Sequence, residues 1–172
     1  MNMKKLFFGL LMLTLCVGIF AQANDQMSGK GIFPFPFQAK DKFGNDVNEK
    51  FWGEKEYFFI YQTATWCPPC VRGMPTLAEV AKEFGDRVGF LALLDDYRTN
   101  LSGAIRITES AGIPSNFIFI DAKLEGVQNI LALVSTGTIP SAVIIGRDGK
   151  RVMQPFHTAN ARTNLNSLFS RR

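Results

Sequence analysis

The sequence is poor in the side chains that bind metals and lacks the basic runs that bind nucleic acids. It contains three Cys and a single His, His157, among 172 residues. A structural zinc site needs four ligands, usually supplied as separated pairs of such residues. No run of Lys and Arg is interleaved with aromatic residues, as a nucleic-acid surface would require. We therefore expect no bound metal and no nucleic-acid partner.

The N-terminus has the three-part pattern of a secretory signal peptide. Residues 1–5 include two lysines, residues 6–20 are uncharged and almost wholly apolar, and residues 21–23 fit the small-x-small cleavage pattern. The apolar run is shorter than the roughly 20 residues of a membrane span, so an uncleaved membrane anchor is the weaker alternative. Cleavage after residue 23 would leave 17 Lys and Arg against 15 Asp and Glu. We expect an exported protein, located in the periplasm or elsewhere outside the cytoplasm.

After this cleavage the chain keeps two cysteines, Cys67 and Cys70, spaced as C-x-x-C. Cys16 belongs to the removed peptide, and the bulky Leu15 before it argues against a lipid-modified cysteine. Disulfides persist outside the cytoplasm, but a purely stabilising bridge across two residues closes almost no loop and gains little entropy. The pair therefore indicates redox chemistry.

Apolar runs and helical periodicities alternate along the chain. Strands are predicted at residues 57–61, 88–94, 117–120 and 142–145, and helices at residues 68–84, 100–111, 123–134 and 160–169. The Asp148-Gly149 turn predicts a hairpin that pairs the last of these strands with residues 151–154. This order predicts an α/β fold with a mixed central sheet flanked by helices.

The cysteine pair stands where a predicted strand meets a predicted helix. Cys67 would lie at the helix N-terminus, where free N–H groups and the helix dipole favour an anionic thiolate. Pro68 and Pro69 lack N–H groups and suit the first turn, which leaves the N–H of Cys70 as the nearest donor to the Cys67 sulfur. The two prolines should also hold the cysteines at bridging distance. We predict that Cys67 is the more exposed, attacking thiol and Cys70 the shielded, resolving thiol.

The segment at residues 63–70, with Trp66 directly before Cys67, resembles the active-site segment of the thioredoxin superfamily. It is most similar to the exported TlpA/ResA-like branch, whose members are thiol–disulfide interchange proteins. Residues 37–47 resemble the N-terminal hairpin of that branch, and Pro75 matches the proline that kinks the active-site helix of thioredoxins. The resemblance covers most of the mature chain.

This resemblance implies a thioredoxin fold with an N-terminal hairpin extension. We expect a signal peptide at residues 1–23, the extension at residues 24–54 and a thioredoxin-like domain at residues 55–172.

The resemblance also implies a cis proline that faces the cysteines. Pro140, which follows Ile139 and precedes a strand, a hairpin and a helix, matches the family's segment. The neighbours of such a proline would present backbone groups to an extended substrate peptide. Pro114 also precedes a strand but lacks this tail, and it remains the alternative. The predicted supporting and substrate-binding residues are Trp66, Pro68, Pro69, Ile139 and Pro140.

The chain departs from the family pattern at residues 61–63, where Gln62 and Thr63 also replace the apolar residues usual just before the motif. Thioredoxins keep a buried acidic residue six positions before the first cysteine, where this chain has Tyr61. No carboxylate occurs in residues 57–70, so a proton acceptor for Cys70 has to come from elsewhere. Glu79 is near in sequence, but we interpret it as a solvated surface charge, and His157 as a surface or capping residue.

Together these features predict an extracytoplasmic thiol–disulfide oxidoreductase that exchanges disulfides with protein substrates. Its redox group would be the Cys67–Cys70 disulfide, without another cofactor, and a membrane thiol–disulfide donor or acceptor would be its electron partner. The N-terminal hairpin favours a reductase, for example in cytochrome c maturation or disulfide repair. A disulfide-forming oxidant and a non-catalytic peptide-binding module or chaperone are the alternatives. A peroxiredoxin-type peroxidase is disfavoured, because Ala64 stands where a Thr would be expected.

Overall fold

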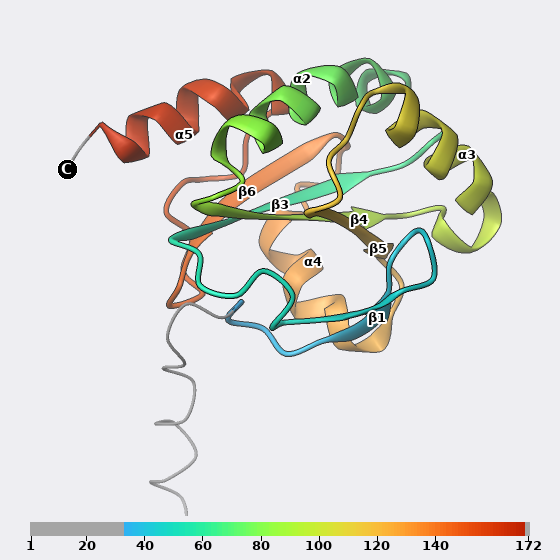
Figure 1. The fold of residues 1–172 in the computed structure, drawn as a ribbon, viewed down its shortest axis with the longest axis horizontal. Helices are drawn as coiled ribbons and strands as arrows, with labels where there is room; N and C mark the ends of the chain where they lie inside the picture. Colours follow the sequence, from blue (N-terminus) through green and yellow to red (C-terminus); the bar gives the residue numbers. More distant parts are fainter. Residues whose placement is uncertain (1–32, 171–172) are drawn as a thin grey trace, which may run out of the picture.

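The computed structural model describes residues 33–170, and Figure 1 shows its arrangement of helices around a central sheet. The signal peptide predicted at residues 1–23 lies outside the described residues. Within residues 33–170, no helix is both long and apolar enough to cross a membrane.

Four strands form the central sheet, in the order β5–β4–β3–β6. Three of them run parallel: β3 (Tyr57–Thr63), β4 (Val88–Leu94) and β5 (Phe117–Asp121). The fourth, β6 (Ser141–Gly146), pairs antiparallel with β3. The predicted mixed sheet is therefore confirmed, and β3 is a central strand with β4 on one side and β6 on the other.

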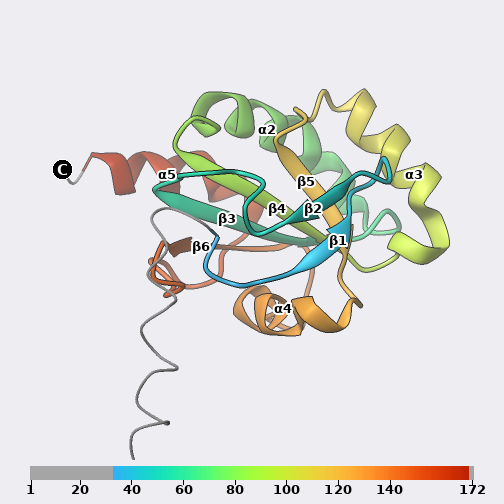
Figure 2. The same ribbon diagram turned by 60° about the horizontal axis from the view of Figure 1, so that its bottom comes forward.

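Helices cover both faces of the sheet. On one face lie α2 (Pro68–Phe84), α3 (Tyr97–Ser110) and α5 (Ala161–Phe169), the last preceded by the short turn η2 (Thr158–Asn160). On the other face lie α4 (Gln128–Val134), with its preceding turn η1 (Glu125–Val127), and the hairpin of β1 (Gln38–Lys40) and β2 (Asp46–Asn48). Figure 2 brings this second face forward, with the hairpin in front of the sheet.

Two hydrophobic clusters result from the alternation of side chains along each strand. On the face of α2 and α5, Phe59 and Tyr61 of β3 pack among buried residues of both helices. On the opposite face, Phe58 and Ile60 pack with α4 and with aromatic residues of the N-terminal segment, including Trp52. The N-terminal hairpin therefore shares its core with the sheet.

Three predicted elements differ from those observed. The helix α3 begins at Tyr97, three residues before the predicted start, and α4 is shorter than residues 123–134 because its first part forms η1. The prediction of a strand at residues 151–154 is wrong: this part of the described chain meets β6 only through isolated bridges at Arg151 and Phe156. Pro155, which cannot donate a ladder hydrogen bond, separates the second bridge from the predicted strand.

Candidate active site

The two cysteines lie at the junction of β3 and α2 and form a disulfide, with their Cα atoms 5.2 Å apart. Cys67 is the N-cap residue of α2, with φ −94° and ψ 102°, and Pro68 and Pro69 occupy the first two helical positions. The N–H of Cys70 donates a hydrogen bond to the Cys67 Sγ over 3.2 Å. This is the local geometry that the sequence predicted.

The surroundings of the pair differ sharply in exposure. Cys67 keeps 3% of its surface exposed and Cys70 none, whereas Trp66 is 65% exposed. Pro68 and Pro69 are exposed as well. In the disulfide form the two cysteines therefore differ little in exposure, and their roles as attacking and resolving thiol stay a prediction.

Apolar residues border the disulfide, and one of them, Ile139, lies just before β6. Ala64 is buried against both cysteines, and the half-buried Ile139 packs against the same cluster. Pairing of Gln62 with Ser141 places the start of β6 beside the end of β3. The bond between Ile139 and Pro140 is the one cis peptide bond in residues 33–170, so the predicted cis bond is confirmed.

The sequence is 24% identical over 149 residues to the thiol-disulfide oxidoreductase ResA of Bacillus thuringiensis strain Al Hakam, an alignment that covers 82% of this chain and 76% of ResA. A solved thiol:disulfide interchange protein from Chlorobium tepidum TLS matches with a TM-score of 0.62 and 18% identity, over 81% of this chain and 97% of the other. A secreted Mycobacterium tuberculosis disulfide oxidoreductase, described as homologous to Escherichia coli DsbE, matches with a TM-score of 0.58 and 15% identity, over 76% and 95%. No protein-family model matches the chain.

The chain has the thioredoxin fold, and its sequence is similar to that of the thiol–disulfide oxidoreductase ResA. The protein is an oxidoreductase of the thiol–disulfide class.

Tyr61 replaces the buried acid of thioredoxins and is itself fully buried. Its hydroxyl has no hydrogen-bond partner among the described residues. Burial raises the pKa of Tyr61 to about 12, and this effect outweighs the lowering influence of the Thr63 hydroxyl, which lies outside hydrogen-bonding geometry. At neutral pH, Tyr61 is therefore a neutral phenol and does not act as the proton acceptor that an acid in this position would supply.

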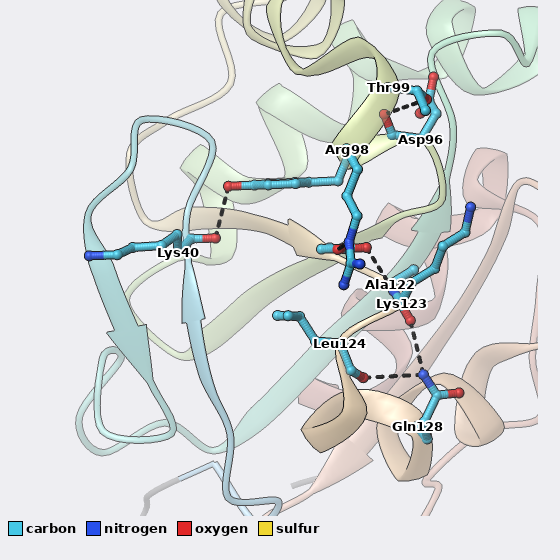
Figure 3. A network of polar contacts seen from close by, with 10 residues as sticks. Lys40, Asp96, Arg98, Thr99, Ala122, Lys123, Leu124 and Gln128 are labelled. Carbon is cyan, nitrogen blue, oxygen red and sulfur yellow. Dashed lines mark hydrogen bonds and ion pairs between the residues drawn. The ribbon is translucent and has the colours of Figure 1, made fainter.

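A buried carboxylate approaches the active-site loop from the segment between β4 and α3. Asp96, two residues after β4, is 8% exposed and accepts hydrogen bonds from the backbone N–H of Thr65 over 3.1 and 3.2 Å. The Thr65 hydroxyl also donates to the Asp96 carboxylate. Figure 3 shows Asp96 beside Thr99, at the start of α3. Parallel pairing of β3 with β4 brings these residues together, and the two consecutive Asp residues after a predicted strand were the signal that could have pointed to them.

A groove of about 770 Å³ lies beside Trp66, on the side of the disulfide away from β6. Thr65, Asp96 and Asn100 line one part of it, and Lys123 lines another. The groove lies where the parallel strands β3, β4 and β5 end, which is where ligands bind in open α/β sheets.

The remaining polar residues singled out by the sequence lie at the surface. Glu79 forms an exposed ion pair with Lys82, 3.1 Å apart, as expected of a solvated charge. His157 is exposed and lines a shallow pocket of about 310 Å³ together with Pro69 and Arg72. Among residues 33–170, no group of His, Cys, Asp or Glu side chains is arranged to hold a metal ion.

Proposed function

We propose that the protein is an exported reductase of protein disulfides that acts through Cys67 and Cys70. The observation that carries this proposal is the hydrogen bond from the Cys70 N–H to the Cys67 Sγ at the N-terminus of α2. A helix N-terminus stabilises a thiolate, and the thiolate is the nucleophile in disulfide exchange. Pro68 and Pro69 leave this N–H as the nearest backbone donor to the sulfur.

The reaction begins with the reduced protein. The Cys67 thiolate attacks one sulfur of a substrate disulfide, so that a mixed disulfide forms while the other substrate sulfur leaves and takes up a proton. The Cys70 thiolate then attacks the Cys67 sulfur, and the second substrate thiol is released. The substrate gains two electrons and two protons, and the protein is left with the Cys67–Cys70 disulfide. A membrane dithiol donor would return it to the reduced state.

The substrate would lie against Trp66 and Ile139, beside the buried Pro140. Trp66 offers an exposed aromatic face, and Ile139 packs against the cluster of Ala64 and the two cysteines. An extended peptide can pair with the backbone beside Pro140. The same surface would serve a substrate that donates electrons, and direction therefore depends on the potential of the cysteine pair.

Export is supported by the N-terminal sequence pattern, and one similar structure is that of a secreted protein. We propose cleavage after residue 23, an N-terminal extension at residues 24–54 and a thioredoxin-like domain at residues 55–172. The mass of the protein recovered from outside the cytoplasm tests the cleavage site, because the uncleaved chain is heavier by 23 residues.

The reaction is tested by the reduction of insulin with dithiothreitol as electron donor. We expect the unmodified protein to accelerate it and both Cys67→Ser and Cys70→Ser to abolish the acceleration. Cys70→Ser should trap mixed disulfides with substrate proteins, whereas Cys67→Ser should trap far fewer. A protein that binds peptides but does not accelerate insulin reduction would be the non-catalytic module. A reduction potential well above that of glutathione would indicate the oxidant instead.

A further inference from the structure

Thr65, two residues before Cys67, makes hydrogen bonds through both its backbone and its side chain. Its backbone N–H and its hydroxyl both donate to the Asp96 carboxylate. Its hydroxyl oxygen also accepts a hydrogen bond from the Asn100 Nδ2 over 2.7 Å. The start of α3 thereby fixes both the backbone and the side chain of the residue that leads into Trp66 and Cys67.

The carboxylate of Asp96 is directed at this loop and not at its own helix. Asp96 is the N-cap residue of α3, a position where an Asp side chain ordinarily accepts an N–H of the first turn. Here that side chain makes no capping hydrogen bond within the described structure. Asp96 caps the helix only through its backbone carbonyl, which accepts hydrogen bonds from the N–H groups of Thr99 and Asn100 over 3.1 and 2.8 Å.

The backbone conformation of Asn100 and the free space beside Gly103 allow the Asn100 side chain to reach Thr65. The Asn100 backbone, with φ −146° and ψ 45°, departs from helical values inside α3. A Cβ atom on Gly103 would lie 2.5 Å from both terminal atoms of the Asn100 side chain. The space that this glycine leaves free is therefore the space that the Asn100 amide occupies next to Thr65.

We propose that Asp96 and Asn100 are positioning residues for thiol–disulfide exchange, acting on Cys67 through Thr65. The proposal rests on the function proposed above. The hydrogen bond from the Cys70 N–H stabilises the Cys67 thiolate only while the sulfur keeps its place at the end of α2, and Thr65 fixes the segment that leads to it. Loosening Thr65 thus lowers the fraction of thiolate at a given pH and slows the attack on a substrate.

Thr65→Val tests the proposal without changing the charge of the site. It removes the hydroxyl that bonds to both partners and keeps the backbone N–H. We expect the midpoint of Cys67 thiolate formation, followed by ultraviolet absorbance of the reduced protein, to move to higher pH. Insulin reduction should slow by about tenfold, since small misplacements of reacting groups have effects of this size or larger. Thr65→Ser, which restores the hydroxyl, should recover both properties, and Asn100→Ala should give a smaller change in the same direction.

Asp121→Ala is the matched control for a loss of stability. Asp121 is a buried carboxylate, 4% exposed, at the end of the neighbouring strand β5, and it bonds to Arg98 and to the N–H of Lys123 and not to the active-site loop. It should lower the melting temperature and leave the thiolate midpoint unchanged. If Thr65→Val behaves like Asp121→Ala, the positioning role is refuted while the proposed function stands. If the unmodified protein reduces no insulin, the proposed function fails, yet the thiolate midpoint still decides the positioning role because its measurement needs no substrate.

Discussion

The two sides of the segment that contains Trp66 and Cys67 are held by opposite kinds of interaction. Toward β6, Ile139 packs against the apolar cluster of Ala64 and the two cysteines. Toward β4, the segment is bound by the hydrogen bonds of Asp96 and Asn100 to Thr65. Both sides lie at the same end of the sheet, one toward β4 and the other toward β6, because β3 is between these two strands.

This difference indicates on which side a bound substrate can replace contacts of the active-site segment. Apolar contacts have no preferred direction and can be exchanged for contacts with another apolar surface. A buried carboxylate that loses its donors carries a full desolvation cost. We therefore expect the loop to remain anchored from α3 while a substrate replaces contacts on the Ile139 side.

Tyr61 carries a buried hydroxyl in the cluster beneath α2, and its replacement should have the largest effect on stability at high pH. The native chain keeps the Tyr61 proton up to about pH 12, whereas an unfolded tyrosine loses it near pH 10. The native state binds more protons than the unfolded state over that interval, so the free energy of unfolding falls as pH rises through it. Two pH units correspond to roughly 3 kcal/mol. We expect Tyr61→Phe to remove this loss, as measured by urea unfolding at several pH values.

Tyr97→Phe is a contrasting control at neutral pH. The Tyr97 hydroxyl donates to the backbone carbonyls of Lys40 and Asp41, over 3.2 and 2.7 Å, whereas the Tyr61 hydroxyl has no partner among the described residues. Tyr97→Phe should lower the free energy of unfolding by about 1 kcal/mol. Tyr61→Phe should leave it unchanged or raise it. Equal destabilisation by the two substitutions at neutral pH would contradict the absence of a partner for Tyr61.

Ile139 tests the apolar side directly. Ile139→Ala removes part of the half-buried contact with Ala64 and the cysteines, which should lower the free energy of unfolding by about 1–2 kcal/mol, less than for a fully buried isoleucine. The opened contact should also let a small thiol reduce the disulfide a few times faster. Leu133→Ala is the control, because Leu133 is a half-buried apolar residue that packs against the cluster on the face of α4. It should lose similar stability, and faster reduction in this control as well would show that the effect is not local to the apolar side.

The apolar side could be predicted from the sequence, and the polar side could not. The position of Cys67 at the end of α2 follows from an apolar strand, a proline pair and helical periodicity, all of which are local signals. The cis bond before Pro140 was implied by the family resemblance and was found. The contact between Thr65 and Asp96 spans 31 residues and depends on the register of β3 against β4. It also depends on where α3 begins, and a start predicted three residues too late left Asp96 in a loop.

Gly103 gives the smallest but most selective test of the polar side. Replacing a glycine inside a helix by alanine ordinarily stabilises a protein by about 0.5–1 kcal/mol. Here the new Cβ would collide with the Asn100 amide and push it away from Thr65. We expect Gly103→Ala to give no gain in stability and to slow insulin reduction a few-fold. Gly126→Ala, at a position with no atom within 4 Å of the added Cβ, should leave the rate unchanged.

A double substitution separates the collision from the general effect of alanine in a helix. In an Asn100→Ala background the amide is gone, so the Cβ at Gly103 meets no obstacle there and the ordinary stabilisation should return. The difference between the effects of Gly103→Ala in the two backgrounds measures the coupling between Gly103 and Asn100. Urea unfolding of the unmodified protein, the two single variants and the double variant gives this coupling. Equal effects in both backgrounds would show that the missing side chain of Gly103 is not what makes room for the Asn100 amide. Insulin reduction should then be equally slow in the single Asn100→Ala and in the double variant, because both lack the hydrogen bond that reaches Thr65 from α3.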